Sequence, residues 1–269
     1  MQRVIFISLF VLLLIGSGAS VQAHELLPKE VVRYIQQHPQ ATPDELRAFA
    51  LTQSPEVAQK FSNSSTEKIL SIVQNQHTSF FDNAWDFLKL GVLHILSGPD
   101  HVLFVLSLLL VFVSISEIVK LATTFTVAHS ITLVLAGTGI LLLPAIVVEP
   151  LIALSIAVMA LTSVFFRESP WMKKHWGKIV LVFCFGLFHG LGFAGLLRDI
   201  AIPDDKFVSS LFAFNIGIEI GQLIVIGCAM PFILYFRHTA WYSRAIQVFA
   251  VFISLLALLW FVQRLLGVG

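Results

Sequence analysis

Apolar and polar residues alternate along the chain in long blocks, which is typical of a bundle of membrane-spanning helices. The apolar blocks lie near residues 84–114, 121–138, 140–166, 179–197, 207–236 and 245–266. Each approaches or exceeds the roughly 20 residues that an α-helix needs to cross a bilayer core. Gly98-Pro99 divides the first block into pieces that are too short to cross separately. The pattern predicts an all-α polytopic membrane helix bundle with about six transmembrane helices, the first broken at Gly98-Pro99.

The basic residues between these blocks support six crossings with both chain ends outside. On that topology the cytoplasmic loops hold Lys120, Arg167, Lys173, Lys174, Lys178, Arg237 and Arg244. The outer loops and the C-terminal end hold only Arg198, Lys206 and Arg264. This asymmetry obeys the rule that short cytoplasmic loops carry the excess of Lys and Arg. Counting block 84–114 as two crossings would place the basic cluster at 167–178 outside.

The first apolar stretch has the features of a secretory signal peptide. Arg3 precedes the apolar core, and Val21 and Ala23 fit the small-residue positions before a cleavage site. We predict a cleaved signal peptide over residues 1–23, with an uncleaved anchor as the alternative. Cleavage would leave His24 as the mature N-terminus, on the periplasmic side of a bacterial inner membrane.

The polar region that follows predicts a small periplasmic helical region over residues 24–83, before a transmembrane domain over 84–269. Its composition favours three or four short helices. "TPDEL", from Thr42 to Leu46, is a helix start with proline in the first turn, and "SSTE", from Ser64 to Glu67, matches a capping box.

Composition supports a membrane protein and narrows its partners. Hydrophobic residues make up 57% of the chain and charged residues only 12%, far from the composition of a soluble domain. The bilayer is therefore an expected partner, whereas a net charge of +1 argues against nucleic acid. Cys184 and Cys228 both lie in apolar blocks, so they offer neither a disulfide framework nor a CxxC metal site. The sequence is compatible with a homo-oligomer but does not define one.

Ionisable side chains inside the predicted spans are the main functional signal. Such groups are costly in the membrane and are functional candidates by default. Most of them fall near the middle of their spans, so several helices would present them at a similar depth. The candidate metal ligands are His94, Asp100, His101, His129, His189 and Glu219.

A second group of residues has weaker claims. Glu149 precedes Pro150 and could serve only to cap a broken helix. Asn215 and Gln222 share a helix face with Glu219. They fit better as residues that orient the metal ligands, or that hydrogen-bond one helix to another, than as ligands themselves. His24 could chelate a metal with its α-amine if the signal peptide is removed. A lone membrane histidine is more often a structural hydrogen-bond donor, and the prediction depends on the coincidence across spans.

Divalent transition-metal coordination is the simplest chemistry that gathers imidazoles and carboxylates. Imidazole suits nickel, zinc, copper and iron, and no cluster of sulfur ligands favours copper(I). Helix breaks such as Gly98-Pro99 place helix ends at membrane binding sites. The pairs Gly186/Gly190 and Gly217/Gly221 predict close helix contacts. If those two segments packed on each other, they would bring His189 and Glu219 together.

The motifs together resemble one known family. "GVLHILSGPDHVLFVLSLLL", "TTFTVAHSITL", "VEPLIALSI", "FGLFHGLGFAG" and "FNIGIEIGQ" look like the HupE/UreJ family of nickel permease-like proteins over about residues 85–225. Members are regarded as nickel or cobalt transporters linked to hydrogenase and urease maturation. The resemblance implies that the H-x5-D-H motif of His94, Asp100 and His101 acts in metal recognition, with His189 in another family motif.

One departure from the family pattern places the chain nearer to its less characterised branch. The hydrogenase-linked branch carries a second His and a Glu soon after "FHG", whereas "FHGLGFAG" has neither, and Glu219 is the candidate to supply the carboxylate. We therefore expect a secondary transporter that takes a divalent ion, nickel or cobalt before zinc or iron, as its substrate. A zinc-dependent intramembrane hydrolase is the alternative, although no HExxH motif or nucleophile motif is present. A metal sensor or an accessory subunit is a lesser alternative.

Overall fold

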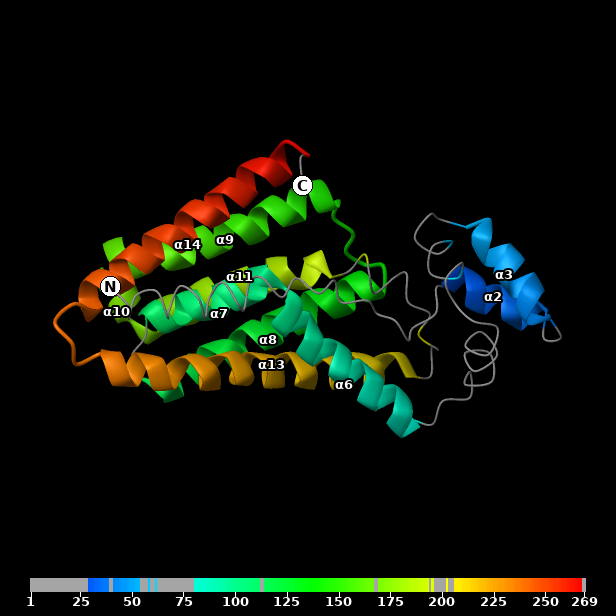
Figure 1. Ribbon diagram of the computed structural model, residues 1–269, viewed down its shortest axis with the longest axis horizontal. Coiled ribbons are helices and arrows are strands. Elements are labelled where there is room, and N and C mark those ends of the chain that lie inside the picture. Colours follow the sequence, from blue (N-terminus) through cyan, green and yellow to red (C-terminus); the bar gives the residue numbers. More distant parts are fainter. Residues whose placement is uncertain are drawn as a thin grey trace.

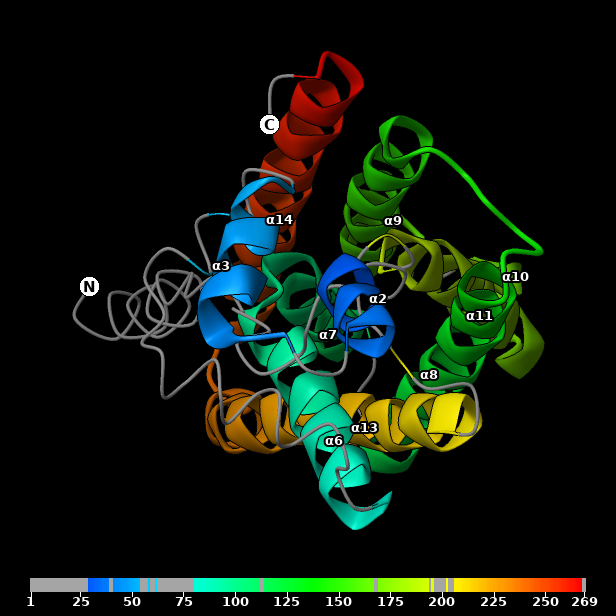
Figure 2. The same cartoon turned by 90° about the vertical axis from the view of Figure 1, so that its right-hand side faces the viewer.

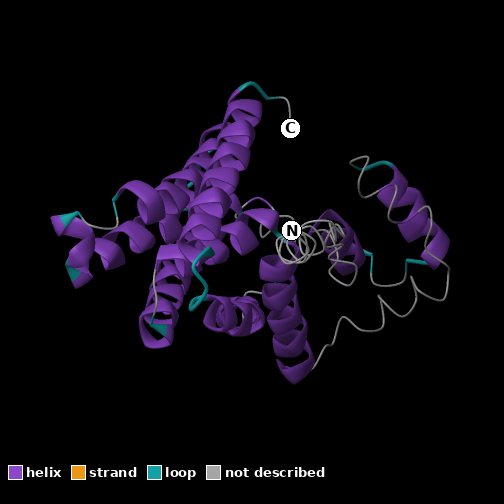
Figure 3. Ribbon diagram, turned by 60° about the vertical axis from the view of Figure 1, so that its left-hand side comes forward, coloured by secondary structure: helices purple, strands orange, loops and turns teal. Residues whose placement is uncertain are grey.

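The computed structural model describes a chain whose regular elements are α-helices. The described residues are 29–38, 41–53, 58, 61, 80–111, 114–166, 169–193, 195, 202 and 206–267, and they contain no strand (Figure 3). This confirms the predicted fold class. The predicted signal peptide 1–23, His24 and the capping box at Ser64–Glu67 lie outside the described residues.

The apolar blocks form a bundle of long helices. They are α6 (Phe80–Ser97), α7 (Pro99–Val111), α8 (Ile115–Gly137), α9 (Ala145–Phe165), α11 (His175–Gly192), α13 (Phe207–Phe236) and α14 (Tyr242–Leu265), with the short α10 (Pro170–Lys173) before α11. Figure 1 shows that α8, α11 and α14 end at the same end of the bundle at which α9 and α13 begin. Successive helices therefore run in opposite directions.

Four of these helices, α8, α9, α13 and α14, are long and apolar enough to cross a membrane. The bent pair α6 and α7 raises the number of crossings to five if it counts as one span. The apolar part of α11, Trp176–Gly192, is shorter, so the expected six crossings require that α11 also spans. Large apolar side chains, including Phe212, Val248 and Leu255, point outward from the bundle, as the helices of a membrane protein require.

The break between α6 and α7 falls at the predicted Gly98-Pro99. The Gly98 N–H still donates to the His94 carbonyl at 3.2 Å, which closes the last turn of α6. The Gly98 carbonyl then accepts from the N–H groups of His101 (3.0 Å) and Val102 (3.1 Å), which opens α7. Pro99 has no N–H with which to continue the ladder of α6. The two helix axes consequently meet at an angle of 69°.

Helix α7 lies inside the bundle, surrounded by the other helices (Figure 2). Every residue from 101 to 109 is buried, including His101. The most extensive helix contacts join α6 to α13, α9 to α14 and α8 to α11. These three pairs enclose the short helix that begins immediately after the break.

Glycines allow two of these pairs to approach closely. A Cβ atom on Gly217 would collide with the Leu88 carbonyl of α6 and would lie 2.9 Å from the Gly91 Cα atom. A Cβ atom on Gly186 would lie 2.7 Å from the Phe125 carbonyl of α8. Both predicted glycine pairs are thus contact faces.

The two glycine faces pack on other helices and not on each other. Gly217 and Gly221 face α6, and Gly186 and Gly190 face α8, so the two motifs do not pack on each other. Sequence motifs of small residues specify that a helix has a close partner but not which helix it is.

Outside the bundle, α2 (Lys29–Gln37) packs on α3 (Pro43–Leu51). The predicted helix start at Thr42 is confirmed as a capping box, because the Thr42 N–H donates to Glu45 Oε2 at 2.8 Å and Thr42 Oγ1 accepts from the Glu45 N–H at 3.4 Å. The backbone N–H of Thr42, and secondarily its hydroxyl, lowers the pKa of the exposed Glu45 carboxyl. Val31, Ile35 and Leu46 are among the buried side chains of this small core.

Gly217→Ala should destabilise the protein because its methyl group has to push α6 away from α13. Overpacking of this kind costs about 1–3 kcal/mol, which exceeds the gain in helix propensity. Thermal unfolding in detergent, followed by size-exclusion chromatography, measures the effect. Gly227→Ala is the matched control, since a Cβ atom on Gly227 would meet nothing within 4 Å. Equal midpoints for the two variants would contradict the close contact.

Candidate metal centre

Three histidines from three helices converge beside the break. His94 lies in the last turn of α6, His101 in the first turn of α7, and His129 in the middle of α8. Each offers one ring nitrogen, and these atoms all lie within 4.8 Å of one another. The ring centroids of His94 and His101 are 4.4 Å apart, and those of His94 and His129 are 5.9 Å apart. The three rings could hold a single ion if their side chains moved closer together.

A fourth imidazole lies next to this group. His189, in the last turn of α11, has its ring centroid 5.3 Å from that of His101. Its Nδ1 atom lies 2.9 Å from the Phe185 carbonyl oxygen. A carbonyl can only accept, so Nδ1 carries the proton and Nε2 of the neutral ring holds a free lone pair. The hydrogen bond therefore orients Nε2 of His189 as a potential metal ligand.

The ring nitrogens of these histidines are buried without partners among the described residues. They are His94 Nε2, both nitrogens of His101, both nitrogens of His129, and His189 Nε2. Polar atoms buried in this way are rare unless another group satisfies them. Neutral imidazole nitrogens are also the ligands that divalent nickel, cobalt and zinc accept. His94, His101 and His129 could therefore hold a transition-metal ion, with His189 next to them.

Phenylalanine rings enclose the imidazoles. The ring centroids of His94 and Phe193 are 4.5 Å apart, and the His189 centroid lies 5.0 Å from that of Phe125. Phe104 and Phe214 complete the contacts, next to His189 and His94. All four phenylalanines are buried. An apolar shell of this kind limits access of water to the nitrogens and lowers the local dielectric constant.

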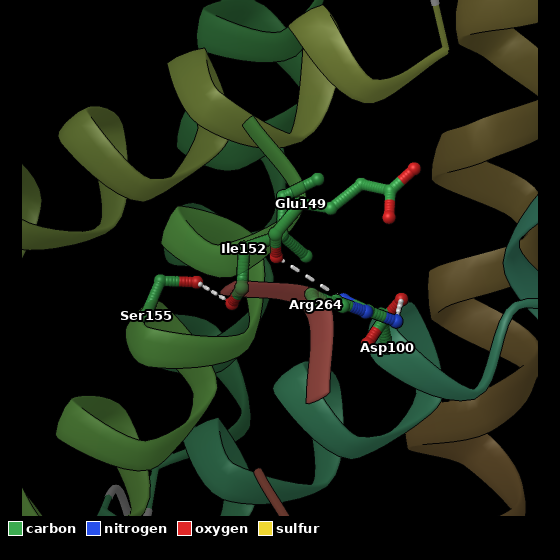
Figure 4. A network of polar contacts seen from close by, with 5 residues as sticks. All are labelled: Asp100, Glu149, Ile152, Ser155 and Arg264. Atoms are coloured by element: carbon green, nitrogen blue, oxygen red, sulfur yellow. Dashed lines mark hydrogen bonds and ion pairs between the residues drawn. The ribbon is translucent and has the colours of Figure 1, made fainter. Parts of the chain in front are cut away.

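Asp100 pairs with a cation on the last helix. Its Oδ2 atom accepts a hydrogen bond from Arg264 Nη2 at 2.8 Å, and Arg264 Nη1 donates to the main-chain carbonyl of Glu149 at 3.2 Å (Figure 4). Asp100 Oδ1 is buried without a partner among the described residues. One guanidinium thus ties α14 to both α7 and α9.

The structure places the remaining carboxylates outside the three-histidine group. Glu149 is exposed and contributes only its main-chain oxygen to Arg264. Glu219 accepts a hydrogen bond from the hydroxyl of Thr123 on α8 at 2.6 Å. One turn along the same two helices, Gln222 Oε1 accepts from the hydroxyl of Thr126 at 3.1 Å.

Two amide side chains on α13, the helix that carries Glu219, also have buried polar atoms without a hydrogen-bond partner among the described residues. Asn215 Oδ1 and Gln222 Nε2 are buried without a partner in the described part of the chain. Gln222 is fully buried and bridges α13 to α8, which agrees with a bridging role more than with a ligand role.

One candidate ligand lies nearer to the end of its helix than the sequence predicts. His189, expected near the middle of its span, lies in the last turn of α11, and Arg264 lies in the last turn of α14.

Sequence reasoning missed two features of this centre. Arg264 was counted only as a charge at the outer end of the chain, although it pairs with Asp100. The aromatic shell carried a detectable signal, because Phe125 and Phe104 stand four and three residues from His129 and His101. Residues at these helical spacings share a face.

Comparisons with known proteins agree with this description. A family model described as HupE / UreJ protein matches residues 70–264, which is most of the chain. The match covers every histidine of the centre and Arg264, and it confirms the resemblance inferred from the motifs. No curated protein and no solved structure matches the chain.

Gly98→Ala should weaken metal binding at this centre without removing a ligand. A Cβ atom at Gly98 would lie 2.7 Å from His101 Nδ1 and 2.7 Å from the His94 carbonyl, so the His101 ring has to move. Misplacing a ligand costs about tenfold or more in affinity, as loss of orienting partners does. Titration calorimetry with Ni²⁺ measures the change. Gly195→Ala, where the added methyl group meets nothing within 4 Å, should bind like the wild type.

Proposed function

The chain belongs to the HupE/UreJ family, and on that premise we propose that it is a permease for a divalent transition-metal ion. It is a multi-pass membrane protein, and its family is associated with nickel and cobalt transport. Nickel or cobalt is accordingly the proposed substrate, before zinc or iron. The proposed location is a bacterial inner membrane with the mature N-terminus in the periplasm.

The observation that carries this proposal is the group of imidazoles with free nitrogens around the α6–α7 break. His94, His101 and His129 could hold one ion together, and His189 Nε2 is oriented beside them. Imidazoles are neutral ligands, so they leave the charge of a divalent ion uncompensated in an apolar shell. A site of this kind binds without trapping, which conduction requires, since an ion has to leave as readily as it enters.

The hydrolase alternative uses the same histidines differently. Three histidines with an open fourth position could also hold a catalytic zinc ion. Such an enzyme needs a general base near the metal-bound water. Among the described residues, the group of mutually close ligand atoms contains no carboxylate, and Asp100 and Glu219 are engaged by Arg264 and Thr123. These contacts favour the permease.

His101→Ala and His129→Ala should each abolish metal accumulation by cells that express the protein. Each change removes one of three converging ligands, and loss of one ligand typically lowers metal affinity by about tenfold or more. Accumulation of nickel, cobalt, zinc and iron is measured by elemental analysis of washed cells, with membrane expression quantified in parallel. His38→Ala, at an exposed position outside the bundle, is the control and should accumulate metal like the wild type.

Purified protein distinguishes the two candidate functions. A permease should bind its metal weakly and exchange it during dialysis, whereas a hydrolase should retain stoichiometric zinc. Normal accumulation in His101→Ala cells with intact expression would refute the permease.

A further inference from the structure

We propose that Arg264 is a tethered cation that occupies Asp100 in the ion-free protein and has to release it when a metal ion binds. The inference rests on the proposed function and adds a residue of the last helix to the transport cycle. Arg264 would act through Asp100 and without touching the ion, so it tunes affinity and release.

The contact geometry suits an exchangeable partner. Arg264 Nη2 lies 2.8 Å from Asp100 Oδ2, and the two side chains are 20% and 19% exposed. The pair is therefore neither fully buried nor fully exposed. Asp100 directly precedes His101, whose ring belongs to the converging group. The second carboxylate oxygen, Oδ1, is buried and has no partner among the described residues. Asp100 is therefore only half engaged by Arg264.

Charge balance gives the reason for exchange. The charges of Asp100 and Arg264 offset each other in this ion pair. A divalent ion entering the histidine group brings two positive charges into an apolar surrounding, where Coulomb interactions are strong. The ion then attracts Asp100 and repels the guanidinium.

Arg264 can leave only by moving, because a guanidinium does not lose its proton in proteins. A second partner is already in place on its own helix. The guanidinium carbon lies 5.6 Å from the centre of the Trp260 ring, one turn earlier in α14. A cation–π contact at that ring can hold the released charge near the outer end of the helix.

The functional consequence is a limit on affinity. While Arg264 competes for Asp100, each binding event has to break the ion pair, and each release event is aided when the pair forms again. The histidine group can then recognise a metal without holding it for long. A bound metal ion thus weakens the ion pair, and the ion pair weakens metal binding by the same free energy.

Arg264→Gln should bind Ni²⁺ about tenfold more tightly than the wild type in titration calorimetry, since it frees Asp100 and removes a repelling charge. Its initial rate of nickel accumulation at saturating metal should fall, because release slows. Arg244→Gln is the matched control: Arg244 is exposed at the start of the same helix, and its loss should change neither quantity. Arg264→Lys keeps the charge but not the two-pronged contact, so its affinity should be intermediate.

The Asp100→Asn background separates this role from a structural one. Without the carboxylate there is nothing to compete for, so Arg264→Gln should add clearly less affinity when Asp100 is already Asn, because only the repulsion by the guanidinium is then removed. This double variant contains neither charge and should fold even if a single variant is unstable. A purely structural ion pair predicts lost stability in each single variant and no gain in affinity.

Unchanged or weaker nickel binding by folded Arg264→Gln and Arg264→Lys would overturn the inference and leave the permease intact. The same holds if the gain in affinity is as large in the Asp100→Asn background as in the wild type. If the wild type itself binds none of the four metals, the permease fails and this inference fails with it.

Discussion

The interruption of the first membrane helix at Gly98-Pro99 is the constraint on which the rest of the centre depends. It ends α6 just after His94 and starts α7 just before Asp100 and His101, and it turns the chain by 69°. A straight helix would place His94 and His101 two turns apart along one face. The bend instead brings their ring centroids to 4.4 Å. Gly98 is needed at this point because any side chain would collide with the His101 ring.

The same bend separates neutral ligands from charges. His101 points into the group of imidazoles, whereas its neighbour Asp100 points to Arg264 on α14. A charge buried in an apolar region is stable only with a partner, and the guanidinium provides one. The bundle therefore gathers its candidate metal ligands, the imidazoles, and leaves the carboxylate beside them in an ion pair. On the proposed function, this division would let one short motif provide both metal recognition and a means of release.

Helix packing decides which polar groups meet. Gly91 and Gly217 let α6 and α13 approach, and Gly186 and Gly190 let α11 approach α8. The second contact carries His189 towards the other histidines, while Glu219 is left to pair with Thr123. The glycine motifs were recognisable in the sequence as contact faces. Their partners were not, because a small residue favours close approach to any helix that fits.

The sequence by itself determined the class of fold, the position of the break and the set of polar residues in the membrane. These features are local, since hydropathy, helix length and the missing N–H of Pro99 act within one segment. Only the tertiary structure decided that four imidazoles converge while Glu149 and Glu219 do not join them. It alone placed Arg264, near the end of the chain, on Asp100. Such pairings depend on how helices far apart in sequence rotate and pack, and no periodicity within one helix encodes its neighbour.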